Sequence, residues 1–349
     1  MSPPPAPGLK PLIGRLAEGE HLSEAEAEAA FGLLMEGEAT PAQMAALLIA
    51  MRLRGETVPE ITGAARAMRA RMLTVDAPEG AIDTCGTGGD ASGTWNVSTA
   101  AAFVIAACGV PVAKHGNRAA SSRSGSADVL EALGVVLDAP MERIERALED
   151  AGITFLLAPR HHSAMRHVAG VRVELGTRTL FNLLGPLSNP ARVRRQVVGV
   201  PARRWLVPLA ETLGRLGAER AWLVHGADGL DELSTTGATY VAELRDGRVE
   251  SFTVEPEDAG LARTNPALLK GGEPIENAEA LRAVLEGGTD GPIGAYRDIV
   301  LLNAAAGLIV ADRAADLRAG VRAAAEAIDS GRAAAVLDQL VAITQGRFP

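Results

Sequence analysis

The sequence has little cysteine: Cys85 and Cys108 are the only two among 349 residues. Two cysteines exclude the disulfide framework of a small secreted scaffold and a zinc site with four cysteine ligands, so we expect a cytoplasmic protein. Long apolar segments are also lacking, since the longest, Ala100 to Ala113 and Ile299 to Ala311, fall short of the ~20 residues that a membrane-spanning helix needs. The Pro-rich start, MSPPPAPGLKPL, contains no apolar signal segment. We therefore expect no membrane association.

Positive charge is in deficit, because 34 Lys and Arg face 43 Asp and Glu and leave a net charge of −9. No overall positive field draws the chain onto nucleic acid, so we expect no nucleic-acid partner. An anionic ligand must instead find a local basic pocket. The length predicts about two domains of ~150 residues each. The 47% hydrophobic and 22% charged residues are typical of a globular protein.

The sequence predicts an α/β protein in two parts: a small all-helical domain and a larger α/β domain. In the first 75 residues, three segments begin with a hydroxyl residue three positions before Glu or Gln, which is typical of helix starts. These pairs are Ser23 and Glu26, Thr40 and Gln43, and Thr57 and Glu60. From about residue 80, short apolar runs alternate with Ala-rich stretches, which predicts a mainly parallel central sheet covered by helices. Asp246-Gly247 between two alternating runs predicts an antiparallel hairpin.

A Gly-rich loop, Asp83 to Asp90 (DTCGTGGD), follows a predicted strand and precedes an apolar helix that we expect Asn96 to cap. Glycines let backbone N–H groups approach oxyanions, and a helix N-terminus adds partial positive charge, so the loop suits a phosphate. An ordinary turn is the alternative. The sequence lacks G-x-x-x-x-G-K-[ST], and the loop lacks the G-x-G-x-x-G spacing, which argues against a P-loop and a dinucleotide site.

The 37 residues between Asp90 and Asp128 contain no Asp or Glu, although they include four cationic or titratable basic side chains. These are Lys114, His115, Arg118 and Arg123. A buried helix explains part of this gap, and a solvated loop is the alternative for the rest. We favour a site for a doubly phosphorylated ligand, because so many donors stand beside a second Gly-rich loop.

Two further clusters carry candidate chemistry. Asp231-Glu232 follows the predicted strand AWLVHG, where one or two carboxylates could hold a Mg²⁺ that bridges phosphates, and plain surface charge is the alternative. Downstream of the cationic stretch, His161, His162 and His167 precede Arg172. Their spacing matches no zinc motif, so we interpret these histidines as ordinary interface residues.

Taken in order, seven segments resemble the anthranilate phosphoribosyltransferases of tryptophan biosynthesis, and the resemblance covers nearly the whole chain. The segments are GTGGD, NVSTAAAF, KHGNRAASS, SGSADVLEALG, the His-x-Ala-Met run, RTLFNLLGPLSNP and DGLDE. The family transfers the 5-phosphoribosyl group from phosphoribosyl pyrophosphate to the anthranilate amine and releases pyrophosphate. A nucleoside phosphorylase of similar architecture is the competing enzyme hypothesis, and a relative that binds nucleic acid is the non-enzyme one.

The resemblance implies the site residues. Those for phosphoribosyl pyrophosphate are Gly86, Gly89, Asp90, Thr94, Asn96, Val97, Ser98, Thr99, Lys114, His115, Gly116, Asn117, Arg118, Ala119, Ala120, Ser121, Ser122 and Ser126. Those for anthranilate are Gly86, Asn117, His162 and Arg172, and those for two Mg²⁺ ions per monomer are Ser98, Asp231 and Glu232. No nucleophile or general base is assigned. The chain departs from the family where it has Arg123 for Lys, Ser163 for Pro and Ser188 for Thr.

The resemblance also implies how the chain is divided. Residues 1–77 with about 172–195 form the helical domain, which holds the acceptor side and pairs two copies in a homodimer. Residues 78–171 and 196–349 form the α/β domain that binds phosphoribosyl pyrophosphate and metal.

Overall fold

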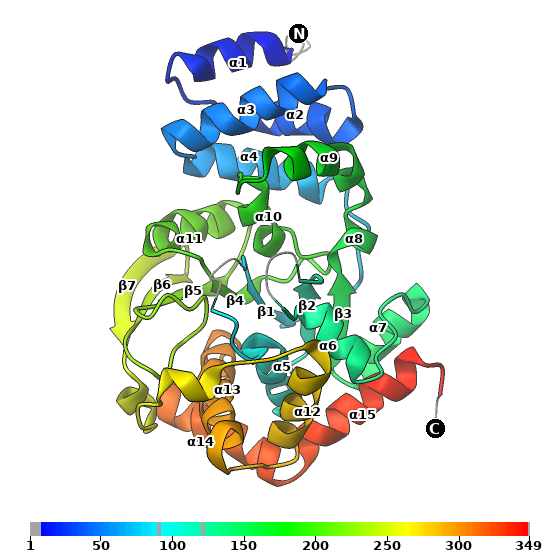
Figure 1. Ribbon diagram of the computed structural model, residues 1–349, viewed down its shortest axis with the longest axis vertical. Helices are drawn as coiled ribbons and strands as arrows, with labels where there is room; N and C mark the ends of the chain where they lie inside the picture. Colours follow the sequence, from blue (N-terminus) through cyan, green and yellow to red (C-terminus); the bar gives the residue numbers. More distant parts are fainter. Residues whose placement is uncertain (1–7, 89–91, 120–122, 348–349) are drawn as a thin grey trace.

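The computed structural model describes residues 8–88, 92–119 and 123–347. Its N-terminal part is a helical bundle, at the top of Figure 1. The helices are α1 (Leu9–Ala17), α2 (Glu24–Glu36), α3 (Pro41–Arg54) and α4 (Val58–Arg69). The capping pairs Ser23 with Glu26 and Thr40 with Gln43 start α2 and α3 as predicted. Helix α1 was not predicted, because its first residue follows Gly8, which has no side chain to cap a helix.

The larger part is built on a seven-stranded sheet in the order β3-β2-β1-β4-β5-β6-β7. The strands are β1 (Ile82–Gly86), β2 (Val112–Gly116), β3 (Ile153–Leu157), β4 (Arg195–Gly199), β5 (Arg220–Gly226), β6 (Thr239–Arg245) and β7 (Arg248–Val254). The first five are parallel, and β6 and β7 add an antiparallel hairpin. Asp246 and Gly247 turn this hairpin with φ angles of 51° and 73°, as the Asp-Gly pair predicts. The predicted fold class is confirmed.

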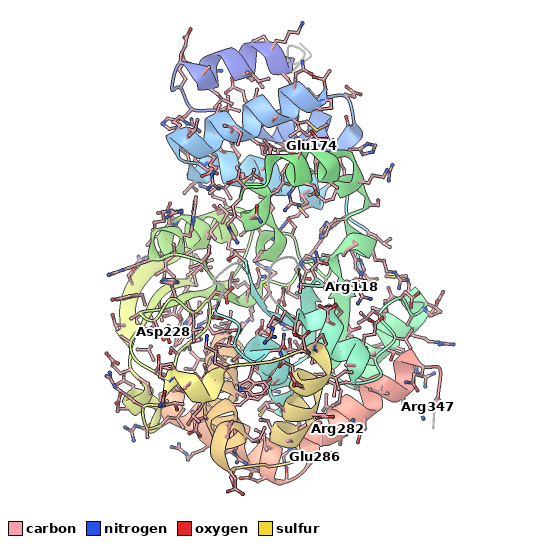
Figure 2. The ribbon with its side chains drawn as sticks, in the orientation of Figure 1. Arg118, Glu174, Asp228, Arg282, Glu286 and Arg347 are labelled. Carbon is pink, nitrogen blue, oxygen red and sulfur yellow. The ribbon has the colours of Figure 1, made fainter. Side chains whose placement is uncertain are left out.

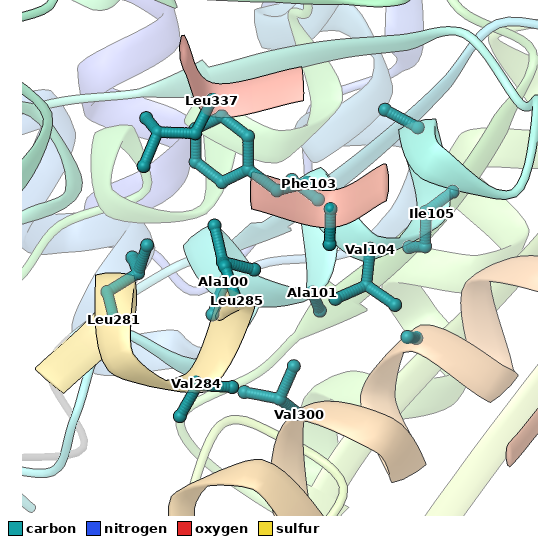
Figure 3. Packing of buried hydrophobic residues seen from close by; sticks show 14 of the residues in the cluster. Ala100, Ala101, Phe103, Val104, Ile105, Leu281, Val284, Leu285, Val300 and Leu337 are labelled. Carbon is teal, nitrogen blue, oxygen red and sulfur yellow. The ribbon is translucent and has the colours of Figure 1, made fainter. Parts of the chain in front are cut away.

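One layer of helices covers the lower face of the sheet in Figure 1. These helices are α5 (Val97–Ala107), α12 (Pro274–Leu285), α13 (Gly291–Val310), α14 (Leu317–Asp329) and α15 (Arg332–Thr344). Figure 3 shows Phe103 and Val104 of α5 packing with Val284, Val300 and Leu337. By length and composition α13 could cross a membrane, but 83% of its apolar window is buried inside the protein. It is therefore a core helix.

The other face of the sheet packs against the bundle through α9 (Arg166–Leu175), α10 (Phe181–Leu187) and α11 (Leu206–Arg215). One hydrophobic cluster runs from Leu48 of the bundle to Leu223 of β5, so both parts share a core. The remaining helices, α6 (Ser126–Ala132), α7 (Met141–Asp150) and α8 (Ala158–His161), connect the strands on the β3 side.

The strand order of the sheet indicates where a ligand binds. From β1 the chain proceeds to β2 and β3 on one side, and β4 and β5 lie on the other. The boundary between β1 and β4 is therefore a switch point, where open α/β sheets bind ligands beyond the carboxyl ends of their strands.

Candidate active site

Asp231 lies directly over the switch point. A Cβ atom added to Gly86, at the end of β1, would lie 2.7 Å from its Oδ2, and one added to Gly199, at the end of β4, would lie 1.6 Å from its carbonyl oxygen. The N–H of Gly88 donates to Asp231 Oδ2 at 3.1 Å. The absence of side chains at the two strand ends is thus what admits the Asp231 loop. Gly88 and Asp231, which are 143 residues apart in the sequence, meet here.

The loop that carries Asp231 and Glu232 is itself closely held. Asp228, labelled in Figure 2, accepts hydrogen bonds from Ser234 Oγ at 2.6 Å and from Leu230 N at 3.2 Å, and these bonds close the turn. Asn303 of α13 accepts from Leu233 N at 3.0 Å and donates to Leu233 O at 2.9 Å. The carboxylate pair therefore occupies a rigid loop. Neither was predicted as a site residue: Asp228 begins the DGLDE segment but had no assigned role, and Asn303 contacts Leu233 across 70 residues of sequence.

Glu232 reaches the start of α5. The N–H of Ser98 donates to Glu232 Oε1 at 3.1 Å, and Lys114 Nζ lies 3.4 Å from Ser98 Oγ and also donates to the carbonyl oxygen of Thr84. The structure thus unites the three residues predicted for metal with Lys114. Burial, followed by the charge of Asp231, raises the pKa of Glu232 to about 8, although Lys114 and Ser98 act in the opposite direction.

This donor set fits a divalent cation. Two adjacent carboxylates that repel one another would both be held ionised by a doubly charged ion. In the described residues, no group of three or more His, Cys, Asp and Glu side chains could hold a metal by itself. A hard cation here would take its other ligands from water and phosphate oxygens, as Mg²⁺ commonly does.

A buried carboxylate supports the site from below. Asp83 of β1 is fully buried and accepts from the N–H of His115 at 3.1 Å and from Asn189 Nδ2 at 2.8 Å. Asn189 also donates to Ala113 O at 2.8 Å. Burial raises the pKa of Asp83, and Lys114 opposes that shift. Asp83 therefore ties β1, the end of β2 and the α10–β4 connection into one unit.

His115 and His162 form a buried pair. Their Nε2 atoms lie 3.3 Å apart, and His115 Nδ1 contacts the Gly185 carbonyl oxygen at 3.1 Å. Burial lowers the pKa of His115 to about 3 and that of His162 to about 4, so both rings are neutral. His161 contacts Leu73 O instead, and His167 lies against Gly37. The histidine-rich segment is thus divided among separate environments.

The cations after Lys114 are paired with carboxylates. Arg118 contacts Glu131 at 2.8 Å and Asp128 at 3.2 Å, beside the start of α6 (Figure 2). Asp128 also accepts from the N–H of Ala119 at 2.9 Å. Arg123 pairs with Glu273 at 3.2 Å. The charge of this segment is therefore neutralised to a larger extent than its acid-free sequence indicates.

Asn96 does not cap α5 with its side chain, contrary to the prediction. Its Nδ2 donates instead to Ser124 O at 3.5 Å, and its Oδ1 accepts from the buried Asn277 at 2.9 Å. The competing partners lie in the loop before α6 and in helix α12, and the backbone N–H of Ser98 at the helix start donates to Glu232.

The other predicted phosphate residues have mixed surroundings. Val97 is buried in the core, and Thr99 Oγ1 donates a hydrogen bond to Ser126 Oγ at 2.9 Å. The backbone of Thr94 forms an isolated antiparallel β-bridge with that of Lys270. The carbonyl oxygen of Asn117 accepts from the N–H of Ala127 at 3.3 Å, and a Cβ added to Gly116 would lie 2.7 Å from the Phe155 ring. Outside the described residues lie Gly89, Asp90, Ala120, Ser121 and Ser122.

Arg172, predicted for anthranilate, projects from α9 with its guanidinium 5.7 Å from the centre of the Phe181 ring. Burial lowers its pKa. Of the positions that depart from the family, Ser163 is exposed next to His162, and Ser188 is fully buried.

Comparison with known proteins shows to which family the chain belongs. Residues 10–72 match the helical bundle domain of a glycosyl transferase family, and residues 78–334 match its a/b domain. An anthranilate phosphoribosyltransferase from Azospirillum brasilense is 61% identical over 349 residues, with 99% of this chain and 97% of the relative covered. The chain belongs to the anthranilate phosphoribosyltransferase family.

Solved structures agree with this assignment. The enzyme from Thermus thermophilus is 48% identical, with a TM-score of 0.89, over 95% of this chain and 99% of that one. The Saccharomyces cerevisiae enzyme in complex with PRPP and Mg is 29% identical, with a TM-score of 0.87, over 97% and 98% of the two chains. The predicted family is confirmed, and with it the prediction of a phosphoribosyltransferase.

Proposed function

We propose that this chain transfers the 5-phosphoribosyl group of phosphoribosyl pyrophosphate to the amine of anthranilate in tryptophan biosynthesis. A bond forms between the amine nitrogen and C1 of the ribose, while the bond from C1 to the pyrophosphate oxygen breaks. Pyrophosphate leaves with the electron pair, and the amine loses a proton. The observation that carries the proposal is the convergence of Gly86, Gly88, Ser98, Lys114 and the Asp231-Glu232 pair at the switch point.

The chain's residues act by position and charge. The N-terminus of α5 supplies partial positive charge for phosphate oxygens, while the N–H groups of Gly88 and Ser98 position Asp231 and Glu232 beside it. Lys114 supplies a fixed positive charge beside them, which favours the departing pyrophosphate over the bound substrate, as charge develops on it. The remainder of the barrier falls because both substrates are held in one orientation. No side chain needs to bond covalently to the sugar.

We assign Mg²⁺ to Ser98, Asp231 and Glu232, with two ions per monomer as the resemblance implies. When bound, Mg²⁺ neutralises charge on pyrophosphate. The yeast relative named above was solved with PRPP and Mg, and another yeast structure holds 4-fluoroanthranilate, which supports these ligands for this chain. A bound cation would hold Glu232 ionised, although its pKa is raised to about 8 in the protein alone.

We also propose the predicted division into residues 1–77 with about 172–195 and residues 78–171 with 196–349. Packing of α9 and α10 against the bundle supports it. A homodimer through the helical part is supported by Leu53 and Val173, apolar side chains that are 82% and 80% exposed there. The cytoplasmic location stays a prediction, as do the absence of nucleic-acid and membrane partners.

The test follows anthranilate fluorescence after mixing the purified protein with phosphoribosyl pyrophosphate, with and without Mg²⁺. We expect a decay that requires all three components. A folded protein that leaves the fluorescence unchanged would contradict the proposal, and nucleosides with inorganic phosphate would then be tested as substrates.

A further inference from the structure

The connection between α9 and α10 carries an arginine, Arg178, to which the sequence analysis gave no role. The described residues offer its guanidinium neither a hydrogen bond nor an ion pair, and its Nη2 atom is buried without a partner. Leaving a charged donor unpaired away from water is costly, so native proteins rarely contain one. The unpaired donor indicates that a group outside the polypeptide completes it.

The charges that act on Arg178 show which groups lie near it. Burial lowers its pKa, the negative charge of Asp231 raises it, and the positive charge of Arg52 lowers it further. Arg172 shows no such influence from Asp231. The guanidinium of Arg178 therefore lies within electrostatic reach of the proposed metal carboxylate.

The backbone at this position is held from both sides. Arg52 of α3 donates through Nη1 to the carbonyl oxygen of Arg178, and the N–H of Thr179 donates to Asn182 Oδ1 at 2.9 Å. The helical bundle thus holds the backbone that carries Arg178. A fixed cation is suited to recognising a ligand, because little conformational freedom is lost on binding.

We propose that Arg178 is a substrate-binding residue whose Nη2 donates to an anionic oxygen held between the α9–α10 connection and the Asp231 loop. This inference rests on the proposed function. Two substrates carry such an oxygen: the pyrophosphate group of the sugar donor and the carboxylate of anthranilate. A guanidinium binds either one through parallel N–H donors.

The experiment compares Arg178→Ala and Arg178→Lys with the wild type in the fluorescence assay, varying each substrate in turn. We expect Arg178→Ala to raise the KM for one substrate by roughly 10- to 150-fold, which is typical of a lost charged hydrogen bond. Arg178→Lys should raise this KM less than Arg178→Ala does, because lysine keeps the positive charge but lacks the planar set of parallel N–H donors. Arg166→Ala, which removes an exposed charge from α9, should change neither KM.

Calorimetric titration of the protein with pyrophosphate in the presence of Mg²⁺ distinguishes the two candidate ligands, pyrophosphate and the anthranilate carboxylate, without turnover. Weaker binding by Arg178→Ala assigns the pyrophosphate, whereas unchanged binding with a higher KM for anthranilate assigns the carboxylate. Unchanged values in all three measurements would overturn the inference, as would a loss explained wholly by a lower unfolding midpoint. If the wild type shows no turnover, the proposed function fails, yet weaker pyrophosphate binding by Arg178→Ala would still support the anion site.

Discussion

The buried pair of His115 and His162 should make the stability of the protein depend on pH in the mildly acidic range. Burial holds the pKa of His115 at about 3 and that of His162 at about 4, whereas a histidine in the unfolded chain titrates near 6.5. As the pH falls below ~6.5, the unfolded chain binds two protons that the folded chain does not, so acid favours unfolding. The stability is fully present above that pH and is lost as the pH falls toward the folded values.

The size of the effect follows from the two shifts. Between pH 7 and pH 5 each histidine should lower the free energy of unfolding by about 2 kcal/mol, so the pair should lower it by about 4 kcal/mol. That is a large share of the roughly 5–15 kcal/mol that holds an ordinary protein folded. His161, whose pKa burial also lowers, should add to the same trend.

Urea unfolding at pH 7, 6 and 5 measures this dependence, with His162→Gln and His115→Gln compared with the wild type. Each substitution should remove about 2 kcal/mol of the difference between pH 7 and pH 5. Because the difference is read within each variant, a uniform loss of stability does not imitate it. His21→Gln, at an exposed histidine, should retain the full dependence. Equal losses in all four proteins would refute the neutral buried pair.

Three further outcomes follow. Replacing Asp231 and Glu232 together by Asn and Gln should abolish Mg²⁺-dependent turnover and leave the urea midpoint near the wild-type value; turnover with normal metal dependence would remove both from the metal site. Arg172→Ala should raise the KM for anthranilate roughly 10- to 150-fold, and an unchanged KM would exclude its contact with the carboxylate. Gly199→Ala should destabilise the fold by about 1–3 kcal/mol or more, because its Cβ would lie 1.6 Å from the carbonyl oxygen of Asp231. The control Gly170→Ala, with open space around the added Cβ, should be neutral or stabilising. Equal urea midpoints for the two variants would show that the Asp231 loop moves aside at little cost.

The sequence was sufficient wherever local patterns decide the structure. Capping pairs located α2 and α3, and the Asp-Gly turn located the hairpin. Strands β3 and β4 were not predicted, because five-residue apolar runs such as Ile153–Leu157 do not distinguish a strand from a buried helical turn. The supports of the site were missed for a different reason. Asp83 and Asn189 lie 106 residues apart, and no spacing rule links a buried carboxylate to an amide so distant.

The positively charged residues show most clearly how the expectation from the sequence differs from the folded structure. The acid-free stretch led us to expect the anion site around Lys114, Arg118 and Arg123. In the folded chain Arg118 and Arg123 are paired with carboxylates that follow the acid-free stretch in the sequence, such as Glu131 and Glu273. Lys114 is held between Thr84 O and Ser98 Oγ.

Two arginines that lack a carboxylate partner among the described residues come from another segment. Arg172 contacts an aromatic ring, and Arg178 has a buried donor without a partner. Arg172 lies on α9, and Arg178 lies on the following connection, where its carbonyl oxygen accepts a hydrogen bond from Arg52 of the bundle. Charge available for a new ligand must be charge that the fold has not already neutralised. The bundle therefore supports the backbone that carries Arg178, whose buried donor we propose for an anionic ligand.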